Sequence, residues 1–187
     1  MGIKDTYFLD RSKAVLVVID IQEKLCQAMN PEVLSALTGN AGILLEAAGE
    51  LGLPVIATEQ YVKGLGETLP PLKSLLPAAA LEKMTFSCCG DPKFMDALKA
   101  TGRNQIIISG METHVCVLQT ALELLDAGFT VHVVADGVMS RHENNWQTGL
   151  SVMAAAGAVI SSTETVLFQL LKVAGTDEFR KLSKLVR

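Results

Sequence analysis

The chain has 187 residues, of which 49% are hydrophobic and 19% are charged, and its formal net charge is −4. These values are typical of a single globular domain spanning residues 1–187, and they argue against a disordered chain. Because the charge is weakly acidic and no long run of Lys and Arg occurs, neither nucleic acid nor a membrane surface is an expected partner.

The apolar runs along the chain, such as Ala14–Ile19 and Leu75–Leu81, are too short to span a bilayer. The first residues carry charges before any apolar run, unlike a secretory signal. We therefore expect a cytoplasmic protein. Its four cysteines are expected to be free thiols, since disulfides are rare in that compartment.

Short apolar runs alternate along the chain with periodic segments that begin at capping residues. The first half predicts the strand Ala14–Ile19, the helix Pro31–Leu51, the strand Pro54–Thr58, a loop over Gln60–Pro77 and a short strand at Leu81–Met84. The second half predicts the helix Pro92–Ala100, the strand Gln105–Ser109, the helix His114–Ala127, the strand Phe129–Ala135, the helix Glu143–Ala156, the strand Ala158–Ser161 and the helices Thr163–Leu171 and Asp177–Val186.

This alternation predicts an α/β fold, a three-layer α-β-α sandwich around a mostly parallel, Rossmann-like sheet of about six strands. Ligands of such sheets bind beyond the carboxyl ends of the strands. The rule singles out Asp20, the turn Glu59–Tyr61 and the segment Gly110–Cys116 as candidate site residues.

Cys116 follows a strand end and a glycine turn, at the start of a predicted helix. A thiol in that setting faces the positive end of the helix dipole, which lowers its pKa and favours the reactive thiolate, and nearby N–H groups could hold an oxyanion. A buried hydrophobic role is equally compatible with the pattern. Cys88 and Cys89 are rival thiols, but they precede Gly90 in a predicted loop without this setting.

Asp20 and Lys83 each allow a structural and a catalytic interpretation. Asp20 could cap the loop after the first strand, or it could place a carboxylate at the rim of an active site. Lys83 by itself is typical of a solvated surface residue, whereas beside a thiol and a carboxylate it would stabilise the thiolate. The three His lack metal-ligand spacing and the dinucleotide fingerprint is absent, so no metal and no cofactor are expected.

Taken together, these segments resemble the isochorismatase-like cysteine hydrolases, a family that includes nicotinamidases and N-carbamoylsarcosine amidohydrolase. The segment Gly110–Cys116 (GMETHVC) is similar to the family's nucleophile motif. The resemblance extends from Ala14 to about Leu171 and implies a catalytic triad of Asp20, Lys83 and Cys116.

Within the family, the resemblance is closest to the animal isochorismatase-domain branch, on the segments Thr58–Tyr61 (TEQY) and Lys63–Gly66 (KGLG). Nicotinamidases place metal-binding His and Asp where this chain has Glu59, Gln60 and Tyr61. This departure argues against a bound zinc and against nicotinamide as the substrate.

The resemblance also implies a cis peptide at Met111–Glu112, which would turn the Glu112 N–H inward to form an oxyanion hole with the Cys116 N–H. The implied reaction is hydrolysis of an amide or related C–N bond in a small molecule through a thioester. Two alternatives remain open: hydrolysis of a vinyl ether, and a non-catalytic binding or redox-responsive module on the same fold. The residues expected to shape the substrate pocket are Gln22, Glu59, Gln60, Tyr61, Phe86 and Thr113.

Two further expectations concern burial and assembly. Lys83 should be buried beside Asp20 and Cys116, because one cation offsets the cost of a thiolate and a carboxylate in a water-poor site. The segment Thr163–Val173 is mostly apolar and nothing later in the chain obviously covers it, so we expect at least a homodimer.

Overall fold

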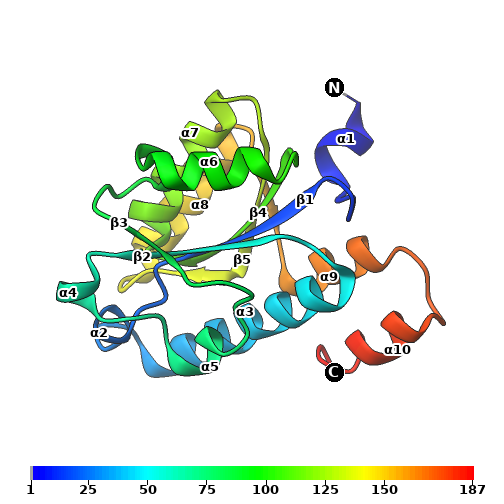
Figure 1. Cartoon of the computed structure of the whole chain (residues 1–187), viewed down its shortest axis with the longest axis horizontal. Helices are drawn as coiled ribbons and strands as arrows, with labels where there is room; N and C mark the ends of the chain where they lie inside the picture. Colours follow the sequence, from blue (N-terminus) through cyan, green and yellow to red (C-terminus); the bar gives the residue numbers. More distant parts are fainter. Residues whose placement is uncertain (1) are drawn as a thin grey trace.

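The computed structural model describes residues 2–187 and contains one parallel β-sheet (Figure 1). Its strands are β1 (Ala14–Ile19), β2 (Val55–Gln60), β3 (Leu81–Lys83), β4 (Gln105–Met111), β5 (Thr130–Met139) and β6 (Val159–Ser161). The order across the sheet is β3-β2-β1-β4-β5-β6, and every neighbouring pair is parallel. The expected three-layer α/β class with a six-stranded, Rossmann-like sheet is confirmed.

Two strands run further than the sequence predicts. β4 continues to Met111 and β5 continues to Met139, with a register shift between them at Ile108 and Gly110. The Ser109 hydroxyl donates to the Gly137 carbonyl oxygen at 2.7 Å across this irregular stretch. The sequence predicts that β5 ends at Ala135, before the polar Asp136. A bulge interrupts the pairing there, and the two strands pair again from Gly110 and Val138 onward.

The helices connect the strands on both faces of the sheet. The described residues form α1 (Ile3–Tyr7), α2 (Glu23–Cys26), α3 (Pro31–Leu51), α4 (Val62–Leu65), α5 (Pro70–Lys73), α6 (Pro92–Ala100), α7 (Leu118–Asp126), α8 (Glu143–Ala155), α9 (Thr163–Leu171) and α10 (Asp177–Leu182). A 3-10 turn covers Cys88–Gly90 and a π-helical turn covers Thr113–Val117. The sequence did not predict α1, α2, α4 and α5, because four or five residues are too few to show helical periodicity. None of the described helices is long and apolar enough to cross a membrane.

The boundaries of α3 follow from its sequence. The Asn30 side chain accepts hydrogen bonds from the N–H groups of Glu32 and Val33, as expected of a capping residue before Pro31. Gly52 ends the helix in the left-handed conformation, with φ of 66°.

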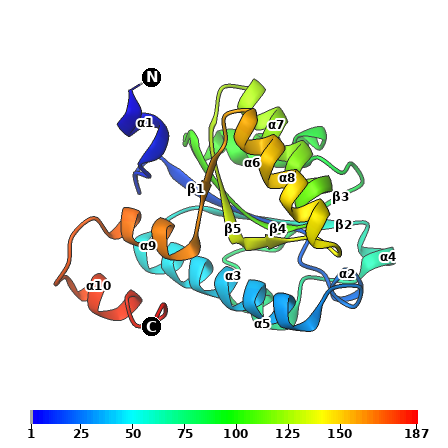
Figure 2. The ribbon, with the colours of Figure 1, turned by 180° about the vertical axis from the view of Figure 1, so that it is seen from behind.

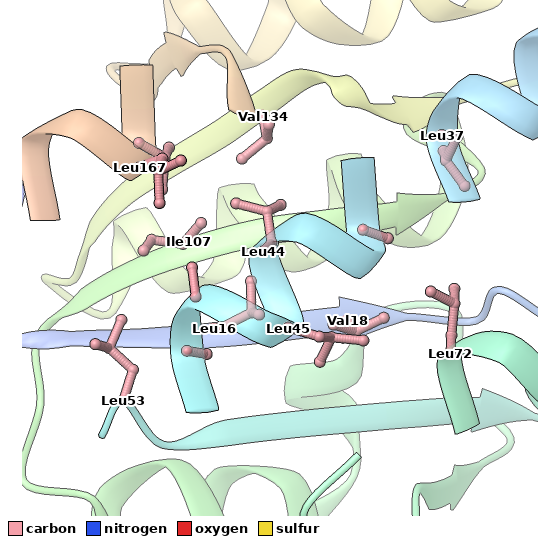
Figure 3. Packing of buried hydrophobic residues seen from close by; sticks show 14 of the residues in the cluster. Leu16, Val18, Leu37, Leu44, Leu45, Leu53, Leu72, Ile107, Val134 and Leu167 are labelled. Carbon is pink, nitrogen blue, oxygen red and sulfur yellow. The ribbon is translucent and has the colours of Figure 1, made fainter. Parts of the chain in front are cut away.

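The core is divided by the sheet into two layers. On one face α3 and α9 pack over Leu16 and Val18 of β1, together with Ile107 and Val134 (Figure 3). On the other face α6, α7 and α8 cover the alternate side chains of β1, from Val15 to Ile19 (Figures 1 and 2). All six residues of β1 are buried, which explains why its sequence is a continuous apolar run.

The expectation that nothing covers Thr163–Val173 is wrong. The inner face of α9 packs within the core through Val166, Leu167, Leu170 and Leu171. The chain then turns back after α9 into α10 (Figure 2). The ring centroids of Phe168 in α9 and Phe179 in α10 lie 6.3 Å apart. The apolar residues of α10 are too few to reveal this packing in the sequence, and Val173 stays 63% exposed.

Gly110 lies where β4 passes closest to β1. Its φ is 138°, and a Cβ atom at this position would be 2.1 Å from the Ile19 carbonyl oxygen. Ile19 and Gly110 are also paired in the sheet. Only glycine therefore allows the end of β4, and the turn that carries Cys116, to approach the end of β1.

We expect Gly110→Ala to destabilise the fold by more than about 4 kcal/mol, because the new Cβ would meet backbone that cannot move independently. Thermal and urea unfolding would measure the loss. Gly39→Ala is the matched control, because Gly39 is exposed on α3 and a Cβ atom there would have no neighbouring atom within 4 Å. That variant should gain about 0.5–1 kcal/mol from helix propensity. Equal stability of the two variants would contradict this account of Gly110.

Candidate active site

The three residues of the expected triad come from three separate segments at one edge of the sheet. Asp20 directly follows β1, Lys83 is the last residue of β3, and Cys116 lies in the π-helical turn after β4. Because all strands are parallel, their carboxyl ends meet at the same edge. The sheet therefore brings together residues that are far apart in the sequence.

Asp20 and Lys83 form a buried ion pair. The Lys83 Nζ atom lies 2.6 Å from Asp20 Oδ2, and the Asp20 and Lys83 side chains are 0% and 2% exposed. Lys83 is therefore buried, as the charge argument expects, and the interpretation of it as a surface lysine is wrong. A buried charge is costly unless it is paired and hydrogen-bonded, so this contact is a strong constraint on the site.

The Lys83 ammonium group has three further acceptors. It donates to Gln60 Oε1 at 2.8 Å and to the carbonyl oxygens of Thr85 and Phe86 at 3.2 and 3.0 Å. Burial alone would lower the pKa of Lys83. Burial is the largest single influence, but the charge and the hydrogen bond of Asp20, together with the thiol groups of Cys88 and Cys116, outweigh it, so the pKa is raised above its usual value. The group therefore remains a cation with its N–H bonds fully engaged.

The Asp20 carboxylate is held on its other side by Thr58. The Thr58 hydroxyl donates to Asp20 Oδ1 at 2.8 Å, and the Asp20 N–H donates to the Thr58 carbonyl oxygen at 3.1 Å. Asp20 has a φ of 52°, which turns the chain sharply out of β1. Aspartate tolerates this left-handed conformation better than most residues, and such conformations gather at functional sites.

Cys116 is buried, with 6% of its surface exposed, and its electrostatic environment differs from the expectation. Burial is the largest cause that raises the pKa of its thiol, and the neighbouring Asp20 charge raises it further, while Lys83 lowers it. The prediction of a lowered pKa is wrong, because desolvation and the carboxylate outweigh the helix terminus and the ammonium group. The Cys116 thiol therefore keeps its proton at neutral pH.

The turn before Cys116 is anchored at Glu112. The Met111–Glu112 peptide is cis, at the position that the family resemblance implies. The Glu112 carboxylate accepts a hydrogen bond from the Arg141 N–H at 2.9 Å and faces the Arg141 Nε at 3.2 Å. The Glu112 carbonyl oxygen accepts from the N–H groups of Val115 and Val117. These contacts hold the backbone that would supply the oxyanion hole.

Thr113, another expected pocket residue, is fully buried at the start of the π-helical turn. α8 packs directly on it, because a Cβ at Gly149 would be 3.0 Å from the Thr113 carbonyl oxygen. Its Oγ1 has no hydrogen-bond partner within residues 2–187. Thr113 thus lies in the same turn as Cys116, and its hydroxyl could form a further hydrogen bond.

Gln22 and Glu59 connect the loops around the site. The Gln22 amide pairs with the Gln60 backbone, donating to its carbonyl oxygen at 2.9 Å and accepting from its N–H at 2.6 Å. Glu59 Oε1 accepts from the N–H and the hydroxyl of Thr68 at 2.6 and 2.7 Å. Both residues stiffen the segment between β2 and α5.

The hydrogen bonds of Glu59 and Gln60 decide whether this segment could bind a metal ion. Glu59 and Gln60, which stand where nicotinamidases carry metal ligands, are engaged by Thr68 and Lys83. Tyr61 is on the surface, 44% exposed. Within the described part of the chain, no cluster of three His, Cys, Asp or Glu side chains could hold a metal ion. These donor groups do not fit a zinc site.

Three large apolar side chains are exposed on the segments that flank Gln60 and Lys83. Tyr61, Met84 and Phe86 are 44%, 67% and 56% exposed. We call these three residues the apolar rim. The sequence analysis named Tyr61 and Phe86 but missed Met84, which has no polar or motif signal to distinguish it.

Cys88 is part of the site, although the sequence placed it in a loop. It is fully buried in a 3-10 turn, and its Sγ lies 3.7 Å from the Thr58 Oγ1. Burial raises the pKa of Cys88 to about 11 and the pKa of Cys89 to about 12. Sequence reasoning could not find the contact with Thr58, because the two residues are 30 positions apart.

The family model of the isochorismatase domain matches residues 14–165. The chain therefore belongs to the isochorismatase family, and its fold and candidate site agree with this assignment. It is 38% identical over 184 residues to the isochorismatase domain-containing protein 2 of Xenopus laevis, covering 95% of this chain and 85% of that protein.

Two solved structures extend this similarity to the fold. The MAR1 ribonuclease of Caenorhabditis elegans superposes with a TM-score of 0.89 at 35% identity, covering 96% of this chain and 92% of that one. The YcaC gene product of Escherichia coli, described as an octameric hydrolase of unknown specificity, superposes with a TM-score of 0.88 at 27% identity, covering 95% and 90%. This chain therefore has the isochorismatase-family hydrolase fold.

The charge balance at Cys116 can be tested by thiol titration. Asp20→Asn removes the negative charge that opposes the thiolate and leaves Lys83 in place, so it should lower the pKa of Cys116. Adding Lys83→Met to that variant removes the stabilising cation and should raise the pKa again. Ultraviolet absorbance of the thiolate measures both changes, with Cys116→Ser variants as the baseline. A higher thiol pKa in Asp20→Asn would contradict the assignment of these charges.

Proposed function

We propose that this protein is a cysteine-dependent hydrolase that cleaves an amide or a related C–N bond in a small molecule. Cys116 is the nucleophile, Asp20 moves the protons, and Lys83 is a fixed counter-charge. The observation that carries the proposal is the buried contact of 2.6 Å between Lys83 and Asp20, whose charges both act on the Cys116 thiol. Membership of the isochorismatase family supports a hydrolytic reaction.

In the first half of the reaction, Asp20 accepts the Cys116 proton as the sulfur attacks the carbonyl carbon of the substrate. The N–H groups of Glu112 and Cys116 bind the oxyanion. The C–N bond then breaks, Asp20 returns the proton to the departing nitrogen, and a thioester on Cys116 remains. Because the resting thiol has a raised pKa, the transfer to Asp20 must accompany the attack.

In the second half, Asp20 takes a proton from water, and the resulting hydroxide attacks the thioester. The C–S bond breaks, the carboxylic acid leaves, and the proton returns to the Cys116 sulfur. Lys83 does not transfer a proton in either half, because its N–H bonds are held by Asp20 and by neighbouring oxygen acceptors. It balances the negative charge as that charge moves between Asp20 and Cys116. No cofactor takes part.

The surroundings of the site favour a small substrate with an apolar part. The rim of Tyr61, Met84 and Phe86 offers apolar contact at the edge of the site. An RNA substrate is disfavoured, although the C. elegans neighbour is named a ribonuclease. The chain has a net charge of −4, whereas nucleic-acid binding depends on cationic contacts to phosphates.

A screen of small amides, ureas and carbamoyl compounds for release of ammonia or amine tests the proposal. On any substrate found, Cys116→Ser and Asp20→Asn should each reduce kcat/KM by about 10³-fold or more, since each removes a reacting group. Lys83→Met should reduce it by about 10²–10³-fold. Cys89→Ser is the matched control, a half-buried thiol outside the mechanism, and should retain activity.

The alternatives give different outcomes in the same screen. A vinyl-ether hydrolase requires a proton donor, so its turnover would depend on Asp20 and survive Cys116→Ser. A binding or redox-responsive module would turn over none of the compounds. Activity that survives Cys116→Ser therefore refutes the thioester mechanism.

We also propose that the protein is a homo-oligomer in a reducing, cytoplasmic compartment. The E. coli neighbour is described as octameric, and all four cysteines of this chain are free thiols. Tyr7, Phe8 and Phe168 are 54%, 57% and 40% exposed, and Gln169 links their segments by donating to the Tyr7 carbonyl oxygen. Exposed apolar side chains gathered in this way are typical of an interface.

Light scattering at micromolar concentration should give the mass of a dimer or larger. Phe8→Asp should shift the protein toward the monomer, because it places a charge in the proposed interface. Val152→Asp is the matched control, since Val152 is 41% exposed on α8, on the other face of the sheet. A monomer mass for the unmodified protein would refute the proposal.

A further inference from the structure

We propose that Thr58 is a positioning residue that orients the Asp20 carboxylate to accept the Cys116 proton, and that the Cys88 thiol orients Thr58 by a hydrogen bond to its hydroxyl. This inference rests on the proposed function, because it needs Asp20 to accept the Cys116 proton. Neither residue has a role in the triad, and Thr58 does not touch the reacting carbon. Its contribution acts through the Asp20 carboxylate.

The geometry of Asp20 motivates the proposal. Each carboxylate oxygen has one donor from a different strand: Thr58 of β2 donates to Oδ1 at 2.8 Å, and Lys83 of β3 donates to Oδ2 at 2.6 Å. The Asp20 side chain is 0% exposed, so water does not replace either donor easily. The two contacts clamp the carboxylate plane and leave its remaining lone pairs for the Cys116 proton.

The direction of the hydrogen bonds follows from the chemistry of the groups. A hydroxyl has one proton, and an ion-paired carboxylate can only accept, so the Thr58 proton points to Asp20. The contact of 3.7 Å between Thr58 Oγ1 and Cys88 Sγ must then have the thiol as its donor. The raised pKa of Cys88, about 11, keeps that proton on the sulfur at neutral pH. The two hydrogen bonds therefore point the same way: the Cys88 thiol donates to the Thr58 hydroxyl, and the Thr58 hydroxyl donates to the Asp20 carboxylate.

β2 supplies supporting contacts to both charged partners. Thr58 and Gln60 are two residues apart, so their side chains lie on the same face of the strand. Thr58 holds the Asp20 carboxylate, while Gln60 accepts from the Lys83 ammonium group at 2.8 Å. The titratable groups around Asp20 are Lys83 from β3, Cys116 from the π-helical turn and Cys88 from the 3-10 turn. Thr58 is the neighbour of Asp20 that donates a hydrogen bond to the carboxylate and does not itself titrate.

The test uses the pH dependence of Cys116 alkylation by iodoacetamide, followed by peptide mass spectrometry from about pH 4 to about pH 9. This probe requires no knowledge of the natural substrate. Thr58→Val keeps the side-chain shape and removes the donor, which disfavours the charged carboxylate. The midpoint of the alkylation rate on the acid side should therefore rise by about one pH unit. Thr58→Ser restores the donor and should restore the midpoint.

Two further variants complete the design. Thr38→Val makes the same chemical change on α3, where the hydroxyl bonds only to the Leu34 carbonyl oxygen, and should leave the midpoint unchanged. Cys88→Ala removes the donor behind Thr58 and should move the midpoint upward by a smaller amount. If Thr58→Val melts below the assay temperature, Cys88→Ala carries the test, and its unchanged midpoint overturns the proposal.

The outcomes separate this inference from the proposed function. If Asp20→Asn removes the acid-side midpoint while Thr58→Val matches the unmodified protein, Thr58 has no positioning role and the triad stands. If Asp20→Asn leaves the acid-side midpoint in place, Asp20 is not the base and the proposed function fails. An upward shift in Thr58→Val that Thr58→Ser reverses supports the positioning role, because a packing defect alone would not restore the midpoint.

Discussion

The buried ion pair between Asp20 and Lys83 is the constraint on which the rest of the site depends. Removing one partner would leave an uncompensated buried charge, at a cost of about 3–5 kcal/mol. The pair joins the ends of β1 and β3 across β2, which must therefore carry polar groups in register. Thr58 and Gln60 are those groups, and Gln22 holds the Gln60 backbone in turn. One electrostatic requirement thus organises three strands and the loops beyond them.

The same ion pair acts on the Cys116 thiol, together with burial. Burial raises the pKa of the Cys116 thiol most, and the negative charge of Asp20 raises it further, while Lys83 lowers it. A thiolate would add a second negative charge beside Asp20, with one cation to balance both. In the proposed reaction the charge instead moves from the carboxylate to the sulfur as the proton moves the other way. The net charge of the site stays constant, which limits the cost of chemistry in a water-poor environment.

The position of Cys116 near this pair depends first on backbone packing. Gly110 allows β4 to lie against Ile19 where a Cβ would overlap the backbone oxygen. The turn after β4 is then fixed by Glu112, whose carboxylate binds Arg141 just beyond the end of β5. The bulge at Ser109 and Gly137 lets β5 reach that far. Packing in the sheet thereby places Cys116 near Asp20, while polar contacts orient the turn.

Local patterns in the sequence by themselves determined the fold class, most element boundaries and the order of the chemically important segments. The apolar run of β1, the Asn30 cap and Gly52 are decided by neighbours a few residues away, which is why they could be predicted. The burial of Lys83 was expected from the charge argument and the family resemblance, and not from its local pattern. Only the tertiary structure decided that the pKa of Cys116 is raised, and that Thr58 and Cys88 support Asp20. Those properties depend on desolvation and on groups that lie 30 or more positions apart in the sequence. Such distances leave no periodic signal in the sequence, because the sheet alone brings these residues into contact.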